Sequence, residues 1–125
     1  MIILGHKDIE SEKIFLVDKI SDISETPANS TIFFKSFDIE ILKFAKKNSV
    51  SVAIEIQNIY EAILSENLDV KYIISEIKLA SQIQKIADNY MYDSKILTWI
   101  EKDGELEKVA ELQIDGVIFR EWIET

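Results

Sequence analysis

The chain has 125 residues, of which 47% are hydrophobic and 30% charged, a balance typical of one globular domain with its own core. It contains no cysteine, which excludes disulfides and thiolate chemistry and fits a cytoplasmic location. The net charge is −9 and Arg120 is the only arginine, so nucleic acids and anionic membranes are not expected partners. No apolar run approaches the roughly 20 residues of a membrane span, and the N-terminus lacks the features of a signal peptide.

We interpret residues 1–125 as a single domain whose first 30 residues form an irregular preface. Residues 1–4 and 13–17 are short strand candidates separated by a polar stretch. Residues 19–30 hold the only proline, Pro27, among Ser, Thr, Asn and Asp, which predicts a connector with one helical turn.

Regular alternation of strands and helices begins at residue 31. β-branched and aromatic runs and period-2 patterns predict five strands, over residues 31–34, 50–56, 70–74, 95–100 and 116–119. Helical spacing of apolar residues predicts four helices between them, over residues 38–47, 58–66, 76–92 and 105–112. Such alternation favours parallel strands joined by right-handed crossovers.

Two α/β architectures fit this pattern. One is an open flavodoxin-like or Rossmann-like sheet with helices on both faces, and the other is a half-barrel of βα units. The open sheet is the preferred interpretation, because the chain is too short for a complete eight-unit barrel. One face of strand 50–56 carries Ser51, Ala53 and Glu55. A small and polar face suits a barrel interior, a site or, as we expect here, an edge strand.

Three stretches between residues 36 and 119 share a pattern. They are Ser36-Phe37-Asp38 followed by Leu42, Lys95 to Ile100 with its Thr98-Trp99 pair, and Ile114-Asp115-Gly116-Val117-Ile118. In these stretches the chain resembles the C-terminal half of the glycerophosphodiester phosphodiesterases, a family of βα barrels. We attribute Gly116 to a tight backbone turn into the last strand.

The catalytic residues of that family have no counterparts in this chain. The family uses a His-Arg pair after its first strand, an acidic metal site and a second histidine. Here Gly5-His6-Lys7 follows the first strand, and His6 is the only histidine. The resemblance therefore implies a non-catalytic relative or a shared scaffold. His6 is expected to cap a turn or to be exposed.

The carboxyl ends of parallel strands are the usual place for ligands in α/β folds. The candidate ligand-binding residues at this edge are Lys35, Ser36, Glu55, Gln57, Ser75, Glu76 and Arg120. Acids outnumber bases there, and neither a dinucleotide-binding nor a P-loop glycine pattern is present. We expect no cofactor, no metal site and no identifiable catalytic residue. The simpler interpretation makes several polar residues helix N-caps: Ser36, Asn58, Ser75 and Asp103.

Two functional hypotheses remain. The first is a non-catalytic module that acts through protein contacts or as a homodimer, with Trp122 as the interface candidate because Trp is enriched at binding hot spots. This hypothesis rests on the absence of a complete set of catalytic residues in the sequence. It also rests on the half-barrel interpretation, in which a partner would have to cover the apolar edges of the sheet. The second is a small-ligand binder, or a metal-dependent phosphoester-type enzyme, with its site at the carboxyl ends of the strands.

Overall fold

The structure, a computed structural model, describes residues 1–123 and places seven strands of that range in one sheet. The strands are β1 (Ile2–Leu4), β2 (Ile14–Leu16), β3 (Thr31–Phe34), β4 (Ser51–Glu55), β5 (Tyr72–Ser75), β6 (Lys95–Ile100) and β7 (Gly116–Phe119). The helices are α1 (Ile39–Lys47), α2 (Ile59–Asn67), α3 (Ile77–Tyr90) and α4 (Leu106–Glu111), with short 3₁₀ turns η1 (Ile20–Glu25), η2 (Asp103–Glu105) and η3 (Arg120–Trp122). None of these helices has the length and apolar character needed to cross a membrane.

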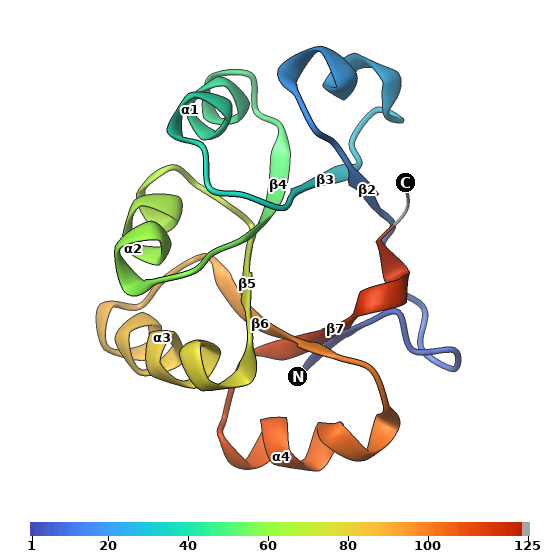
Figure 1. The fold of residues 1–125 in the computed structure, drawn as a ribbon, viewed down its shortest axis with the longest axis vertical. Helices are drawn as coiled ribbons and strands as arrows, with labels where there is room; N and C mark the ends of the chain where they lie inside the picture. The colour runs from blue at the N-terminus through green and yellow to red at the C-terminus, as the bar shows by residue number, and fades with distance from the viewer. Residues whose placement is uncertain (124–125) are drawn as a thin grey trace.

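The sheet is parallel throughout and curls as it follows the chain. Its order is β1-β7-β6-β5-β4-β3-β2, so each strand from β2 to β6 pairs with the next one along the chain, and β7 also pairs with β1. Right-handed crossovers that always step in one direction leave their helices on one side of a sheet. Helices α1 to α4 accordingly lie outside the curl (Figure 1). This is the order of a βα barrel that lacks, among its described strands, only the pairing between β1 and β2.

The alternation of side chains along the strands produces two separate apolar layers. Outward-facing residues such as Ile54 and Ile73 pack with the helices in one cluster. Inward-facing residues such as Phe33, Leu97 and Ile118 form a second cluster, to which α1 to α4 contribute no residue. Two independent layers explain why these strands are apolar on both faces although helices cover only one of them.

The curled architecture confirms the half-barrel interpretation and the five strands expected after residue 31, and it corrects three other expectations. The sheet has seven strands because the two N-terminal candidates join its opposite edges. The open flavodoxin-like sheet is wrong, since the helices lie on one face. The edge position expected for strand 50–56 is also wrong, because β4 pairs with both β3 and β5. Its small, polar face lines the interior.

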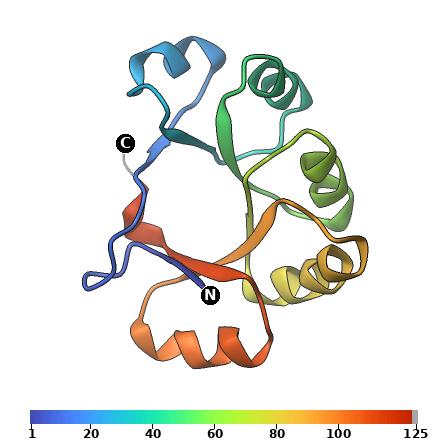
Figure 2. The ribbon, with the colours of Figure 1, turned by 180° about the vertical axis from the view of Figure 1, so that it is seen from behind.

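Segments from both ends of the chain fill the gap between β1 and β2. Seen from behind, the N-terminal connector and η3 lie together between the two edges (Figure 2). The indole Nε1 of Trp122 donates a hydrogen bond to the carbonyl oxygen of Glu12 at 2.7 Å. Gly5 has a φ of 95°, and a Cβ there would lie 2.7 Å from Cβ of Trp122. Only glycine permits this packing.

Gly116 is required for a different reason from the turn expected at this position. It pairs with Ile2 where β7 meets β1, and a Cβ on Gly116 would lie 2.3 Å from the carbonyl oxygen of Ile2. The close approach of two strand backbones therefore excludes a side chain here.

Polar side chains close the interior at the amino-terminal ends of the strands. The carboxylate of Glu12 accepts hydrogen bonds from the hydroxyls of Tyr72 and Thr31 and from Nζ of Lys71, the last two at 2.9 and 3.1 Å. Burial alone would raise the pKa of Glu12, but these hydrogen bonds outweigh it and hold the pKa below its usual value. Burial and the same carboxylate raise the pKa of Tyr72. Glu12 thus ties the connector, in its ionised form, to the starts of two strands, β3 and β5.

We predict that Glu12 makes the stability of the protein sensitive to acid. Because the pKa of Glu12 is lower in the folded chain, its contribution is present above the unfolded pKa, near 4.5, and is lost as the pH falls through the folded value. Glu12→Gln should lower the free energy of unfolding by roughly 1 kcal/mol at pH 7 and flatten its decline below pH 5. Urea unfolding from pH 7 to pH 3 measures both effects. The control is Glu10→Gln, at an exposed position of the same connector, and equal acid sensitivity of both variants and the wild type would refute the role of Glu12.

Candidate functional site

The carboxyl ends of the strands surround a cavity on the inner side of the curl. Its volume is about 230 Å³, and its lining consists of Leu16, Phe33, Lys35, Glu55, Trp99, Arg120 and Ile123. These residues come from the ends of β2, β3, β4 and β6 and from the segment after β7. The polar cluster around Glu12 lies at the opposite ends of the strands, so we call this opening the mouth of the curl.

The floor of the mouth cavity is aromatic. Trp99 follows Leu97 by two residues on β6 and therefore shares its inward direction. Only 8% of Trp99 is exposed, and its ring meets that of Phe33 edge to face, with centroids 5.6 Å apart and planes at 86°. Its Nε1 donates a hydrogen bond to Oε2 of Glu55 at 3.0 Å. This bond fixes the indole and gives the carboxylate of Glu55 a partner.

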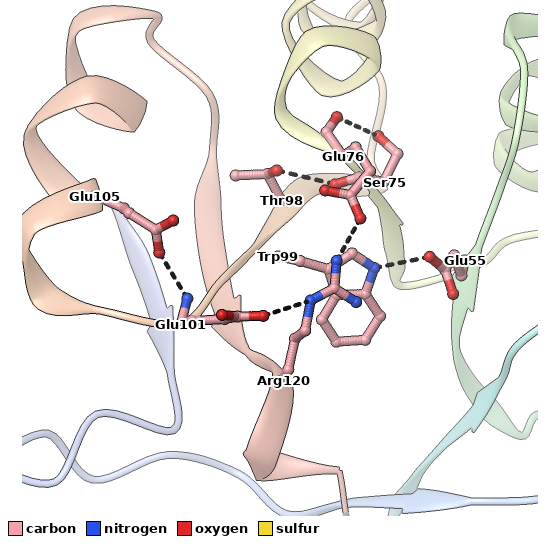
Figure 3. A network of polar contacts seen from close by, with 8 residues as sticks. All are labelled: Glu55, Ser75, Glu76, Thr98, Trp99, Glu101, Glu105 and Arg120. Carbon is pink, nitrogen blue, oxygen red and sulfur yellow. Dashed lines mark hydrogen bonds and ion pairs between the residues drawn. The ribbon is translucent and has the colours of Figure 1, made fainter.

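Arg120 lies above this floor and is held from two sides. Its Cζ lies 5.0 Å from the centroid of the Trp99 ring, in range of a cation–π interaction. Its guanidinium forms ion pairs with Glu76 and, at 3.5 Å, with Glu101 (Figure 3). The first carboxylate follows β5 and the second follows β6. Arg120 thus links three strand ends, and its charge is neutralised by two acids outside the cavity lining.

Lys35 differs from the other two charged residues of the cavity lining, because its side chain is not engaged by another of the described residues. It follows the last residue of β3 and is exposed. Within residues 1–123 it has no hydrogen-bond or ion-pair partner. Its ammonium group is therefore available to a ligand without breaking an internal contact.

The structure separates the other predicted site residues from this cavity. Gln57 and Glu76 line a neighbouring cavity of about 380 Å³ beside the start of α3, and Glu55 lines both cavities. Ser75 is buried, and its carbonyl accepts a hydrogen bond from the hydroxyl of Thr98 at 2.9 Å. Ser36 is exposed in the turn after β3 and lines neither cavity. Of the seven predicted residues, the mouth cavity contains Lys35, Glu55 and Arg120.

Trp122 lies behind the mouth cavity rather than in its lining. It is half-buried and packs against the inner cluster. Its adjacent residue, Ile123, reaches the cavity itself. The role of Trp122 as an interface anchor stays a prediction.

The sequence did not identify three of the residues that line the mouth cavity. Leu16, Phe33 and Ile123 read as ordinary core residues because an apolar residue carries no chemical signal of its own. Trp99 is buried with the inner core cluster, but it also forms the cavity floor. The signal for its second role was its position at the carboxyl end of a strand, on the inward-facing side.

Side chains cap the starts of α1 and α2 but not those of α3 and α4, and only one of the four expected caps is found. Asn58 caps α2 as predicted, through a bond from the Glu61 N–H. Asp38 replaces Ser36 as the cap of α1, and the start of α3 has no side-chain cap, so Ser75 does not serve there. Glu105 accepts bonds from the backbone N–H groups of residues 101 and 102, which lower its pKa; Asp103 does not cap this turn.

His6 caps a turn, which was one of its two expected roles. Its Nδ1 accepts a hydrogen bond from the N–H of Asp8 at 3.0 Å, so this nitrogen carries no proton. Its Nε2 must then carry the proton that is directed at Oδ1 of Asp103, 3.2 Å away. With both nitrogens engaged, His6 has no free lone pair for general-base catalysis. It ties the end of β1 to η2.

Residues 1–123 contain no group of three or more His, Asp or Glu side chains placed to hold a metal ion. Comparison of the chain with protein-family models gives no match, and comparison with curated proteins gives none either. The resemblance to the glycerophosphodiester phosphodiesterases therefore stays a prediction, and the geometry of the mouth carries the functional argument.

Proposed function

We propose that this chain is a non-catalytic module that binds a small organic molecule in the mouth cavity. The observation that carries the proposal is an unpaired lysine, Lys35, at the rim of a cavity whose floor is aromatic. Ligand sites combine an apolar lining with a few polar groups in this way. The position also agrees with the general placement of ligands at the carboxyl ends of parallel strands.

We propose no catalytic activity because most polar side chains at the carboxyl ends of the strands are engaged in internal hydrogen bonds or ion pairs. Glu55 accepts a hydrogen bond from Trp99, Arg120 is paired with two carboxylates, and both nitrogens of His6 are engaged. A general base or nucleophile needs a free lone pair near the substrate. In the mouth lining only the Glu55 carboxylate keeps one, on its second oxygen, and no histidine, serine or cysteine stands beside it there. The proposal therefore assigns binding, and not a reaction, to this lining.

A small-molecule fragment screen tests this proposal. Fragments that bind at the mouth should raise the melting temperature, because binding to the native state stabilises it, and should shift the indole N–H signal of Trp99 in NMR spectra. Leu16→Phe narrows the cavity and should weaken these responses. Ile20→Phe, at an exposed position of η1 outside the cavity lining, is the matched control and should leave them unchanged. The proposal is wrong if no fragment shifts the Trp99 signal, or if Leu16→Phe leaves all responses intact.

A second candidate function, self-association, is supported by the outer face of α2. Ile59, Tyr60 and Ile63 are 37%, 64% and 41% exposed. Positions 59 and 63, and 60 and 63, are neighbours on a helix surface, so the three side chains form one apolar patch. The sheet edges give less support to a dimer, since η3 and the connector fill the gap between β1 and β2.

Light scattering coupled to size-exclusion chromatography tests the second function. If the α2 patch joins two copies, the wild type should show twice the monomer mass at high concentration, and Ile63→Glu should return it to the monomer. Ile9→Glu, at an exposed position of the N-terminal connector, should have no effect. A monomer at every concentration would remove self-association from consideration.

A further inference from the structure

We infer that the ligand of the mouth cavity is a small organic monoanion, a carboxylate carried on a compact apolar body. The inference rests on the proposed function and adds the chemical class of the ligand. It follows from three features of the cavity: the pairing of its charged residues, its apolar floor and its volume.

The pairing of the charged side chains favours an anion. Three charged residues line the cavity: Lys35, Glu55 and Arg120. Arg120 is paired with Glu76 and Glu101, which lie outside the lining, and Glu55 accepts a hydrogen bond from the Trp99 indole. Lys35 is the charged lining residue that has no partner among the described residues. A cationic ligand would bring a second positive charge toward it, whereas a carboxylate would give the ammonium group its missing partner.

A single negative charge fits this site better than two. Glu55 stands in the same lining as Lys35, and a phosphate dianion would be repelled by that carboxylate. No glycine-rich loop offers backbone N–H groups for a phosphate. These features distinguish a carboxylate from a phosphate ester.

The floor and the size define the rest of the ligand. Leu16, Phe33, Trp99 and Ile123 offer only apolar surface apart from the indole N–H, which Glu55 already occupies. The volume of about 230 Å³ equals that of roughly eight water molecules at about 30 Å³ each. A single ring or a short branched chain with one carboxylate fills this space.

An NMR titration with benzoate and its isosteres tests the inference. Benzoate carries the charge, benzamide has the same shape without it, benzylammonium reverses it, and inorganic phosphate is an anion without an apolar body. Benzoate should shift the Trp99 indole signal saturably and bind up to about fivefold more tightly than benzamide, the upper end of what a solvent-exposed ion pair contributes. Phosphate and benzylammonium should leave the signal in place.

Lys35→Met keeps the length and apolar stem of the side chain but removes its charge. It should weaken benzoate binding by up to about fivefold and leave benzamide binding unchanged. Lys85→Met, on the exposed side of α3, is the control and should change neither. Added salt should reduce the preference for benzoate in the wild type.

The outcomes separate the ligand class from the site. If benzamide or benzylammonium shifts the Trp99 signal as strongly as benzoate, or if Lys35→Met binds benzoate like the wild type, the ligand class is wrong while the mouth remains a binding site. If phosphate alone produces the shift, the ligand is an inorganic anion and the inference is again wrong. If none of the four probes, and no member of the fragment screen, shifts the signal, the proposed function fails as well.

Discussion

The contact between Trp122 and the N-terminal connector covers the gap between β1 and β2, and the closed interior of the molecule depends on it. A parallel sheet that curls without closing leaves two free edges and an open apolar interior. Here the Trp122 indole donates to the Glu12 carbonyl and packs on Gly5, whose missing side chain makes the approach possible. One residue near the C-terminus thus covers the inner layer where β1 and β2 do not pair. The carboxylate of the same Glu12 closes the amino-terminal end of the interior, and the mouth is left open.

Local patterns account for much of the fold. The strands after residue 31 were predictable because consecutive residues show both the alternation of strands with helices and the length of each strand. The joining of β1 and β2 to opposite edges was not, because each has three residues and its partner is set by contacts distant in sequence. The direction of curl was also hidden. The polar inner face of β4 indicated it, but that pattern also suits an edge strand, and only the pairing of β4 on both sides decides between them.

The candidate site was predictable to the extent that charge and topology define it. Strand ends that carry Lys35, Glu55 and Arg120 meet because parallel strands bring their carboxyl ends to one edge. The neutralisation of Arg120, and with it the isolation of Lys35 as a free cation, depends on side-chain geometry that no local pattern encodes. The apolar floor was equally hidden, since Phe33 and Trp99 look like core residues. Acids outnumber bases at this edge, but the structure pairs two of them, Glu76 and Glu101, with Arg120 and leaves Lys35 without a partner among the described residues.

Denaturant unfolding of a Trp122→Ala variant tests the central claim, that this side chain closes the interior, most directly. The account predicts that the free energy of unfolding falls by about 2–3 kcal/mol, somewhat less than for a fully buried tryptophan because Trp122 is half-buried. Trp122→Phe, which keeps a ring over Gly5 but loses the hydrogen bond to Glu12, should recover part of that loss. A loss below about 0.5 kcal/mol for Trp122→Ala, the range of ordinary surface substitutions, would contradict the account.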